Sequence, residues 1–271
     1  MGRELLQALA ELIGTFFFLF TAFSGAAAAR RQSSLTGASG AQGGDSDYMT
    51  AAISFGFGLM VACWVTLRIS GGALNPAVVL ALALVRAMPL RKAALYIVAQ
   101  ICGGFLATGL VTALNPGSFL GANALTPGVS RAQVMFLEAI MTALLCLVVL
   151  FLAYEKHSST MLAPTIIGLT VWVSHIVLIP YDGCSINPAR AMAGALGQHN
   201  WHDMWIFVLG PFIGSFIAAG IFAFFKHFKY EQLVNPYADI DALYLHQVAD
   251  PRGQRDHVLV AGRDPDGPPG C

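Results

Sequence analysis

The chain has 271 residues, of which 56% are hydrophobic and only 11% are charged. Soluble proteins carry about 25% charged residues, so this composition excludes an ordinary soluble globule. The 15 basic and 15 acidic residues cancel, which leaves no net positive charge for a polyanionic partner and excludes nucleic acid as the main ligand.

Long intervals without Asp, Glu, Lys or Arg predict membrane-spanning helices, because a bilayer core needs about 20 mostly apolar residues per helix. The interval 93–130 is too long for one helix and is divided by the turn signals Asn115-Pro116-Gly117 and Thr126-Pro127-Gly128. Six spans are expected, near residues 8–29, 48–68, 91–113, 131–153, 162–180 and 203–226.

The order of motifs repeats in the two halves of the chain. Glu11 and Glu138 each begin a Glu-x-x-x-Thr pattern in the first and fourth spans. The triplets Asn75-Pro76-Ala77 and Asn187-Pro188-Ala189 follow the second and fifth spans. Because each half has three spans, an odd number, the second half enters the membrane from the opposite side, which predicts inverted repeats.

The segments that begin with Asn-Pro-Ala, 75–86 and 187–197, are too short to cross the bilayer. Each starts like a helix, with Asn at the N-cap and Pro at the first helical position. Irregular backbone at membrane depth is tolerated only inside protein or beside a watery cavity, so we expect residues 70–74 and 181–186 to line one. The predicted fold class is an all-α membrane protein with six transmembrane helices plus two re-entrant half-helices in an inverted 3+3 repeat.

Two segments resemble the signature loops of the aquaporins, the major intrinsic protein family: Ser-Gly-Gly-Ala-Leu-Asn-Pro-Ala-Val (70–78) and Gly-Cys-Ser-Ile-Asn-Pro-Ala-Arg (183–190). The resemblance covers about residues 8–226, and two Asn-Pro-Ala triplets with Arg190 directly after the second are highly specific. It implies six tilted helices around one pore per subunit, half-helices that meet at mid-membrane, and a homotetramer in the lipid bilayer.

The predicted half-helices indicate that a pore between them would exclude cations and protons. Their N-termini present partial positive charge at the bilayer centre, which repels a cation or a proton. Asn75 and Asn187 can cap their helices through the side-chain oxygen and keep the amide NH₂ as a donor to a permeating oxygen.

Arg190 is the residue that we expect to select the solute. Its charge is costly at membrane depth, so backbone carbonyls should hold it and its guanidinium should face water. The resemblance implies that Phe55, His175 and Cys184 form a selectivity filter with it, the set found in water-selective members. Glycerol-conducting relatives typically carry Trp, Gly and Phe at these three positions, and Asp where this chain has Ala191. If Cys184 lines the filter, mercurials should block flow.

Glu11 and Glu138 are carboxylates inside spans, which is costly unless they are paired or lie on a cavity. The resemblance implies that each hydrogen-bonds the backbone of a re-entrant loop and supports the half-helix; proton relay or ion coupling is the less favoured alternative. Six glycines are expected to be close contacts between helices: Gly58, Gly103, Gly104, Gly168, Gly210 and Gly214. The five cysteines have no zinc-site spacing, so we expect no metal site and no cofactor.

Flanking charges predict the orientation. With the N-terminus inside, eight basic residues fall on cytoplasmic flanks and three outside, so both termini should be cytoplasmic. The eight are Arg3, Arg68, Arg86, Arg91, Lys92, Lys156, Lys226 and Lys229, and the three are Arg30, Arg31 and Arg131. We expect a channel domain over 1–229 (repeats about 8–113 and 131–226), a mobile tail over 230–271, and the plasma membrane rather than an internal one.

The expected function is a passive, water-selective channel driven by osmotic gradients, which excludes ions and protons and is not an enzyme. A broader aquaglyceroporin-like pore for glycerol, urea, ammonia or peroxide is one alternative. A secondary transporter is another, since inverted repeats with broken helices serve those too, but no carboxylate lies beside Asn75 or Asn187 to couple an ion. The last alternative is a membrane-junction protein with a closed pore.

Overall fold

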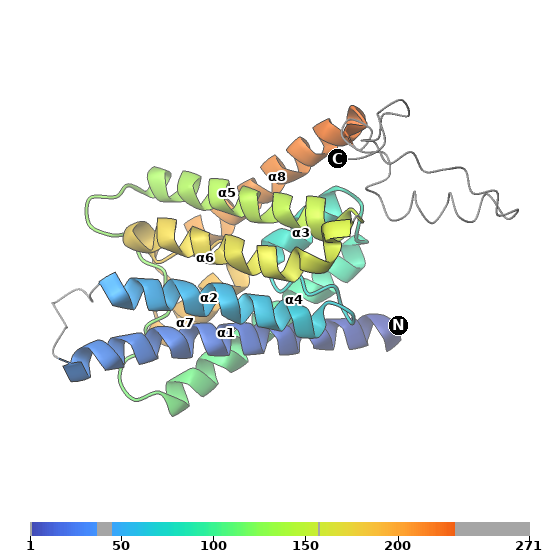
Figure 1. The fold of residues 1–271 in the computed structure, drawn as a ribbon. Helices are drawn as coiled ribbons and strands as arrows, with labels where there is room; N and C mark the ends of the chain where they lie inside the picture. Colours follow the sequence, from blue (N-terminus) through green and yellow to red (C-terminus); the bar gives the residue numbers. More distant parts are fainter. Residues whose placement is uncertain (1, 37–44, 157, 231–271) are drawn as a thin grey trace, which may run out of the picture.

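The computed structural model describes residues 2–36, 45–156 and 158–230, and all of its regular elements there are helical. In this part of the chain, six helices are long and apolar enough to cross a membrane, which confirms the predicted fold class. They run side by side (Figure 1). They are α1 (Gly2–Thr36), α2 (Asp45–Thr66), α4 (Leu90–Leu114), α5 (Arg131–Val148) with its π-helical extension η1 (Val149–Tyr154), α6 (Ala163–Asp182), which follows the short η2 (Ser158–Leu162), and α8 (Ile206–His227).

Two helix ends differ from the prediction. α1 begins at Gly2 and continues to Thr36, beyond the predicted 8–29. α6 ends at Asp182, so residues 181 and 182 are helical, whereas we expected them in the loop. Gly183 stops the helix, because its φ of 81° is the left-handed conformation that ends many helices and that glycine adopts without strain. The predicted tail, apart from Tyr230, lies outside the described residues.

The Asn-Pro-Ala segments form the two short helices α3 (Pro76–Leu84) and α7 (Pro188–Gln198). The side-chain oxygen of Asn75 accepts the N–H of Ala77 at 2.8 Å. The side-chain oxygen of Asn187 accepts the N–H of Ala189 at 3.0 Å. Each asparagine thus satisfies a backbone donor that the helix start leaves unpaired, and the predicted caps are confirmed.

The two halves pack in the same way and interlock. α1 contacts α2 and α4, α5 contacts α6 and α8, and α2 against α6 joins the halves. Each half-helix also packs against the last helix of the other half, α3 on α8 and α7 on α4. The hydroxyl of Ser215 in α8 donates to the carbonyl of Ala77 at 2.7 Å, and that of Thr108 in α4 donates to the carbonyl of Ala193 at 2.9 Å.

Glycines let these helices approach closely. A Cβ on Gly103 of α4 would lie 2.3 Å from the carbonyl oxygen of Leu12 in α1. In the second half, a Cβ on Gly214 of α8 would lie 2.5 Å from the carbonyl oxygen of Ala139 in α5. No side chain fits at such distances, which explains the small residues at these helix crossings.

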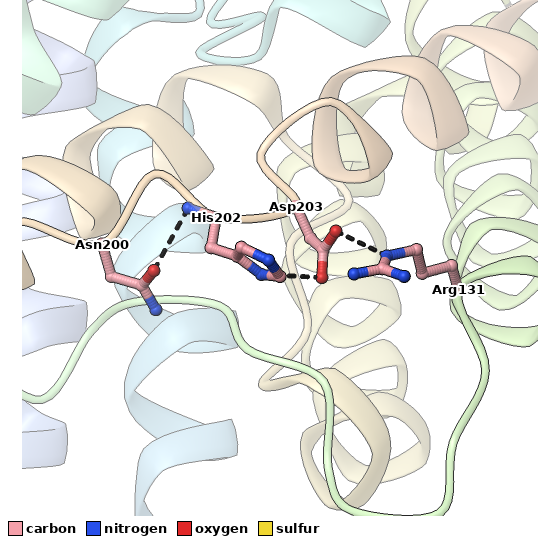
Figure 2. A network of polar contacts seen from close by, with 4 residues as sticks. All are labelled: Arg131, Asn200, His202 and Asp203. Carbon is pink, nitrogen blue, oxygen red and sulfur yellow. Dashed lines mark hydrogen bonds and ion pairs between the residues drawn. The ribbon is translucent and has the colours of Figure 1, made fainter.

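We call the end of the bundle that carries the 115–130 connection the loop end, and the opposite end, where Gly2 and Tyr230 lie, the terminal end. At the loop end a polar network joins the start of α5 to the segment before α8 (Figure 2). Nε of Arg131 donates to Oδ1 of Asp203 at 2.7 Å, and Nδ1 of His202 lies 2.9 Å from Oδ2 of Asp203. The hydrogen bond from Arg131 lowers the pKa of Asp203 below its ordinary value of 3.8.

We expect Asp203→Asn to lower the thermal unfolding midpoint by a few degrees at neutral pH. A carboxyl whose pKa is depressed in the folded state stabilises the fold above its unfolded-state pKa, and that stabilisation is lost as the pH falls through the folded-state pKa. The difference from the unsubstituted protein should therefore vanish on acidification. Unfolding midpoints in detergent from about pH 7 to about pH 3 measure it, and a constant difference across that range would contradict this role.

Candidate functional site

The starts of the two half-helices meet in the interior and are joined by their asparagines. Nδ2 of Asn75 donates to the carbonyl of Ile186 at 2.8 Å, and Nδ2 of Asn187 donates to the carbonyl of Leu74 at 2.9 Å. An amide NH₂ has two donor hydrogens. Each asparagine therefore keeps one donor for the pore, not the whole amide as we expected, because the other hydrogen serves the opposite loop.

The residues directly before the asparagines complete this junction. Leu74 and Ile186 are both fully buried and both have φ of 47°, a conformation that is uncommon for residues other than glycine and strained for a β-branched side chain. This backbone geometry turns each carbonyl toward the asparagine of the other half. The symmetry of the repeat is thus present at the level of single hydrogen bonds.

A narrow cavity of about 50 Å³ extends from the junction toward the terminal end. Its lining includes residues 70–73 of the first loop, Asn75 and Val78, with apolar side chains such as Leu59 and Val149 opposite. The volume is close to that of one or two water molecules. For the first loop, this agrees with the expectation that the backbone of residues 70–74 lines a cavity; the same expectation for residues 181–186 is not tested by this cavity.

Arg190 lies on the loop-end side of the junction, in the first turn of α7, and is 3% exposed. Its Nη1 donates to the carbonyl of Gly121 at 2.9 Å and to the side-chain oxygen of Asn123, and its Nη2 donates to the carbonyl of Gly183 at 3.0 Å. The carbonyls were expected. The contact with Asn123 was not, because that residue lies in the 115–130 connection, where no helical periodicity fixes its position.

The four residues of the predicted filter come from α2, α6, α7 and the loop before α7. The rings of Phe55 and His175 stack with centroids 4.3 Å apart, and the guanidinium carbon of Arg190 lies 4.9 Å from the centre of the Phe55 ring. Cys184 is fully buried, next to Gly183, whose carbonyl holds Arg190. Phe23, which the sequence did not single out, lies on the same guanidinium at 5.8 Å.

Two polar atoms in this cluster have no hydrogen-bond partner among the described residues, Nε of Arg190 and Nε2 of His175. Nδ1 of His175 lies 2.8 Å from the carbonyl of Val171. A carbonyl can only accept, so Nδ1 carries the proton and Nε2 is an acceptor. The cluster therefore offers one free donor and one free acceptor.

Each supporting glutamate contacts the loop of its own half. Oε1 and Oε2 of Glu11 accept the N–H groups of Ala73 and Leu74, at 3.1 and 2.8 Å. Oε1 and Oε2 of Glu138 accept those of Ser185 and Ile186, both at 2.6 Å. These are the contacts that the resemblance implied. They satisfy backbone donors that lipid could not satisfy.

Two buried polar residues around the glutamates were missed. Gln100 of α4 donates its side-chain amide to Glu11 at 2.8 Å. Asp182, at the end of α6, accepts the N–H of Cys184 at 2.7 Å. Both could have been found from the sequence, since an amide within a span and a carboxylate next to a signature loop are costly in a membrane unless they have a partner.

Comparison with known proteins gives consistent results. The model of the major intrinsic protein family matches residues 3–222. Aquaporin-8 of Botryotinia fuckeliana (strain B05.10) is 42% identical over 229 residues, which cover 84% of this chain and 70% of that protein. Aquaporin-2 of Saccharomyces cerevisiae is 36% identical over 237 residues, which cover 87% of this chain and 81% of that protein.

A solved structure shows the same fold. The X-ray structure of the aquaglyceroporin from Plasmodium falciparum superposes with a TM-score of 0.68 and covers 86% of this chain and 98% of that chain, at 21% sequence identity. At this identity the likeness concerns the fold alone. From the family match and the relatives, the chain belongs to the major intrinsic protein family, the aquaporins, and is a multi-pass membrane channel protein, not an enzyme.

Proposed function

We propose that this channel is selective for water and that osmotic gradients drive the flow. The observation that carries the proposal is the cluster of Phe55, His175 and Arg190, in which two stacked rings leave one donor and one acceptor unpaired. A water molecule needs just such a pair, because it can accept from Nε of Arg190 while it donates to Nε2 of His175.

The site offers less to a larger solute. Glycerol has three hydroxyl groups and a carbon backbone, and it would need several polar partners and a wider apolar wall to replace its hydration. The Phe55 ring lies against both the His175 ring, at 4.3 Å between centroids, and the guanidinium carbon of Arg190, at 4.9 Å, so ring atoms fill the space beside Arg190. These contacts favour water over the broader aquaglyceroporin-like pore, and we propose the filter set Phe55, His175, Cys184 and Arg190 on this ground.

Exclusion of ions and protons rests on fixed charge. Arg190 remains protonated at any physiological pH, and the starts of α3 and α7 add partial positive charge at the junction. Asn75 and Asn187 each keep one amide hydrogen for the pore, so a water molecule there accepts from two donors. A water oriented in this way cannot accept a proton from its neighbour, which interrupts proton transfer along the file.

We also propose the orientation and the assembly that the sequence indicated. The eight basic residues of the predicted cytoplasmic flanks all lie at the terminal end of the bundle, which supports cytoplasmic termini. Large apolar side chains are exposed on the outer surface, for example Phe17, Val61 and Phe216, at 54%, 58% and 58%. Lipid and neighbouring subunits of a homotetramer in the plasma membrane would cover them.

Stopped-flow light scattering of proteoliposomes tests the function. In an impermeant osmolyte and in glycerol, we expect equally fast shrinkage from water efflux, followed in glycerol by re-swelling no faster than in protein-free vesicles. Rapid re-swelling in glycerol would establish the broader pore. Shrinkage at the rate of empty vesicles would instead establish a closed membrane-junction protein.

The double substitution Arg190→Val with His175→Ala should admit glycerol, because it removes the guanidinium and one of the stacked rings. A barrier lowered by about 1.4 kcal/mol raises the glycerol flux about tenfold, which the re-swelling phase of the same assay resolves. Trp64→Ala in α2, an exposed residue of similar bulk far from the filter, is the control. Unchanged selectivity of the double variant would place the filter elsewhere.

Mercurial inhibition tests the position of Cys184. We expect mercuric chloride to reduce the water permeability of the unsubstituted channel and to have no effect on Cys184→Ser, since a metal on this thiol would obstruct the filter. Cys102→Ala, which removes an exposed thiol on α4, should remain sensitive. Persistent inhibition of Cys184→Ser would show that another cysteine lines the pore.

A further inference from the structure

The two halves build the same turn before each half-helix with different side chains. In the first half, the hydroxyl oxygen of Ser70 accepts the N–H of Gly72 at 3.2 Å. In the second half, Oδ1 of Asp182 accepts the N–H of Cys184 at 2.7 Å. Ser70 and Asp182 each lie five residues before the asparagine of the half-helix. Since a hydroxyl suffices for this turn, the turn does not explain the second oxygen of Asp182.

The supporting glutamates differ as well. Glu11 accepts the two N–H groups of its loop and, as a third donor, the side-chain amide of Gln100 at 2.8 Å. Glu138 accepts the two N–H groups of its loop at 2.6 Å each. Among the described residues no side-chain amide takes the place of Gln100 beside Glu138.

The repeat explains why this donor is missing. Gly103 and Gly214 are equivalent, because each packs on a backbone carbonyl of the helix that carries the supporting glutamate, one residue after that glutamate. Three residues before them stand Gln100 in the first half and Pro211 in the second. The side chain of proline has no donor, so the position of α8 that is equivalent to Gln100 cannot supply the third hydrogen bond.

Asp182 occupies the position from which that bond can come. It is fully buried, and its Oδ2 meets no N–H or O–H donor in the described part of the chain. Its Oδ1 accepts the N–H of Cys184, and Glu138 accepts the N–H of the next residue, Ser185, so the two carboxyls are neighbours on the same loop and interact electrostatically. Two ionised carboxylates in contact repel strongly, and a shared proton removes the repulsion. Both oxygens of Glu138 already accept backbone N–H groups, which favours its ionised form.

We propose that Asp182 is a protonated carboxylic acid that positions the second signature loop. Its Oδ1 accepts the N–H of Cys184, and its Oδ2–H donates to Glu138. One side chain thereby makes the two kinds of hydrogen bond, to the loop N–H and to the glutamate, that Ser70 and Gln100 make separately in the first half. The other ionisable groups that face Asp182 are Arg190 and the thiol of Cys184, and the negative charge of Glu138 then balances the positive charge of Arg190.

This role bears on selectivity through Arg190 and so rests on the proposed function. The carbonyl of Gly183, the residue after Asp182, accepts from Nη2 of Arg190 at 3.0 Å. The carbonyl of Asp182 itself accepts from the side-chain amide of Asn123 at 3.2 Å, and Asn123 also contacts Arg190. A shift of Asp182 would therefore move two of the groups that hold the guanidinium.

Substitutions that keep or remove the donor test the proposal. In Asp182→Asn, the amide oxygen can accept from Cys184 and the NH₂ can donate to Glu138, so we expect water permeability and glycerol exclusion equal to those of the unsubstituted channel. Asp182→Ser keeps only the acceptor and Asp182→Ala keeps neither, so both should lose water permeability several-fold or leak glycerol. Loss in Asp182→Asn, or full activity in Asp182→Ser, would overturn the proposal.

Infrared spectroscopy of the full chain in lipid gives a direct readout that a merely structural role would not affect. We expect a protonated-carboxyl C=O band at neutral pH that is absent from Asp182→Asn. Asp203→Asn, which also removes one carboxyl at the loop end but an ion-paired one, should keep the band. Absence of the band from the unsubstituted channel, or its persistence in Asp182→Asn, would refute a protonated Asp182.

The two tests separate this proposal from the function. If the unsubstituted channel conducts glycerol, water selectivity fails, but the spectrum and the rates of the variants relative to it still decide the state of Asp182. If Asp182→Ala does not assemble, the spectrum and the permeability of Asp182→Asn decide it alone.

Discussion

The structure depends on satisfying backbone polar groups where two helices begin inside a membrane. Lipid offers no hydrogen bonds, so each N–H and carbonyl at mid-depth needs a protein partner or must face water. The two asparagines meet most of this need. Each caps its own helix and binds the carbonyl before the other half's asparagine, and each glutamate accepts N–H groups of the approaching loop. Each half-helix therefore depends on the other half to satisfy the polar groups at its start.

The halves share this frame but differ in charge, and the difference carries the proposed selectivity. On the loop-end side of the junction stands Arg190, held by two carbonyls and one side-chain oxygen. At the equivalent position of the first half stands Val78, which lines the apolar cavity. A symmetric scaffold thus carries different side chains in its two halves, with the buried guanidinium of Arg190 on one side of the junction and a mostly apolar cavity on the other.

The sequence predicted much of this because membranes restrict the possible structures. Apolar length gave the six spans, and Asn-Pro at the start of a short segment gave the half-helices, since both signals are local. The 115–130 connection was different. Asn123 and Gly121 reach Arg190 from a segment without helical periodicity, and only the folded chain shows which residue of such a loop touches the guanidinium. The end of α6 was also placed two residues too early: the predicted span ends at residue 180, but Pro180 is accommodated within the helix, which continues to Asp182.

The exchange of half-helices between the halves has a consequence for synthesis in the cell. α3 packs on α8, and its first turn is tied by Ser215, a residue that the ribosome adds more than a hundred positions later. The start of α3 lacks the asparagine of the other half until Asn187 is added, and it lacks this hydroxyl until α8 is added. The contacts of α3 with the second half can therefore form only after α8 has been synthesised, so the re-entrant segment of the first half cannot reach its final packing when it is itself made.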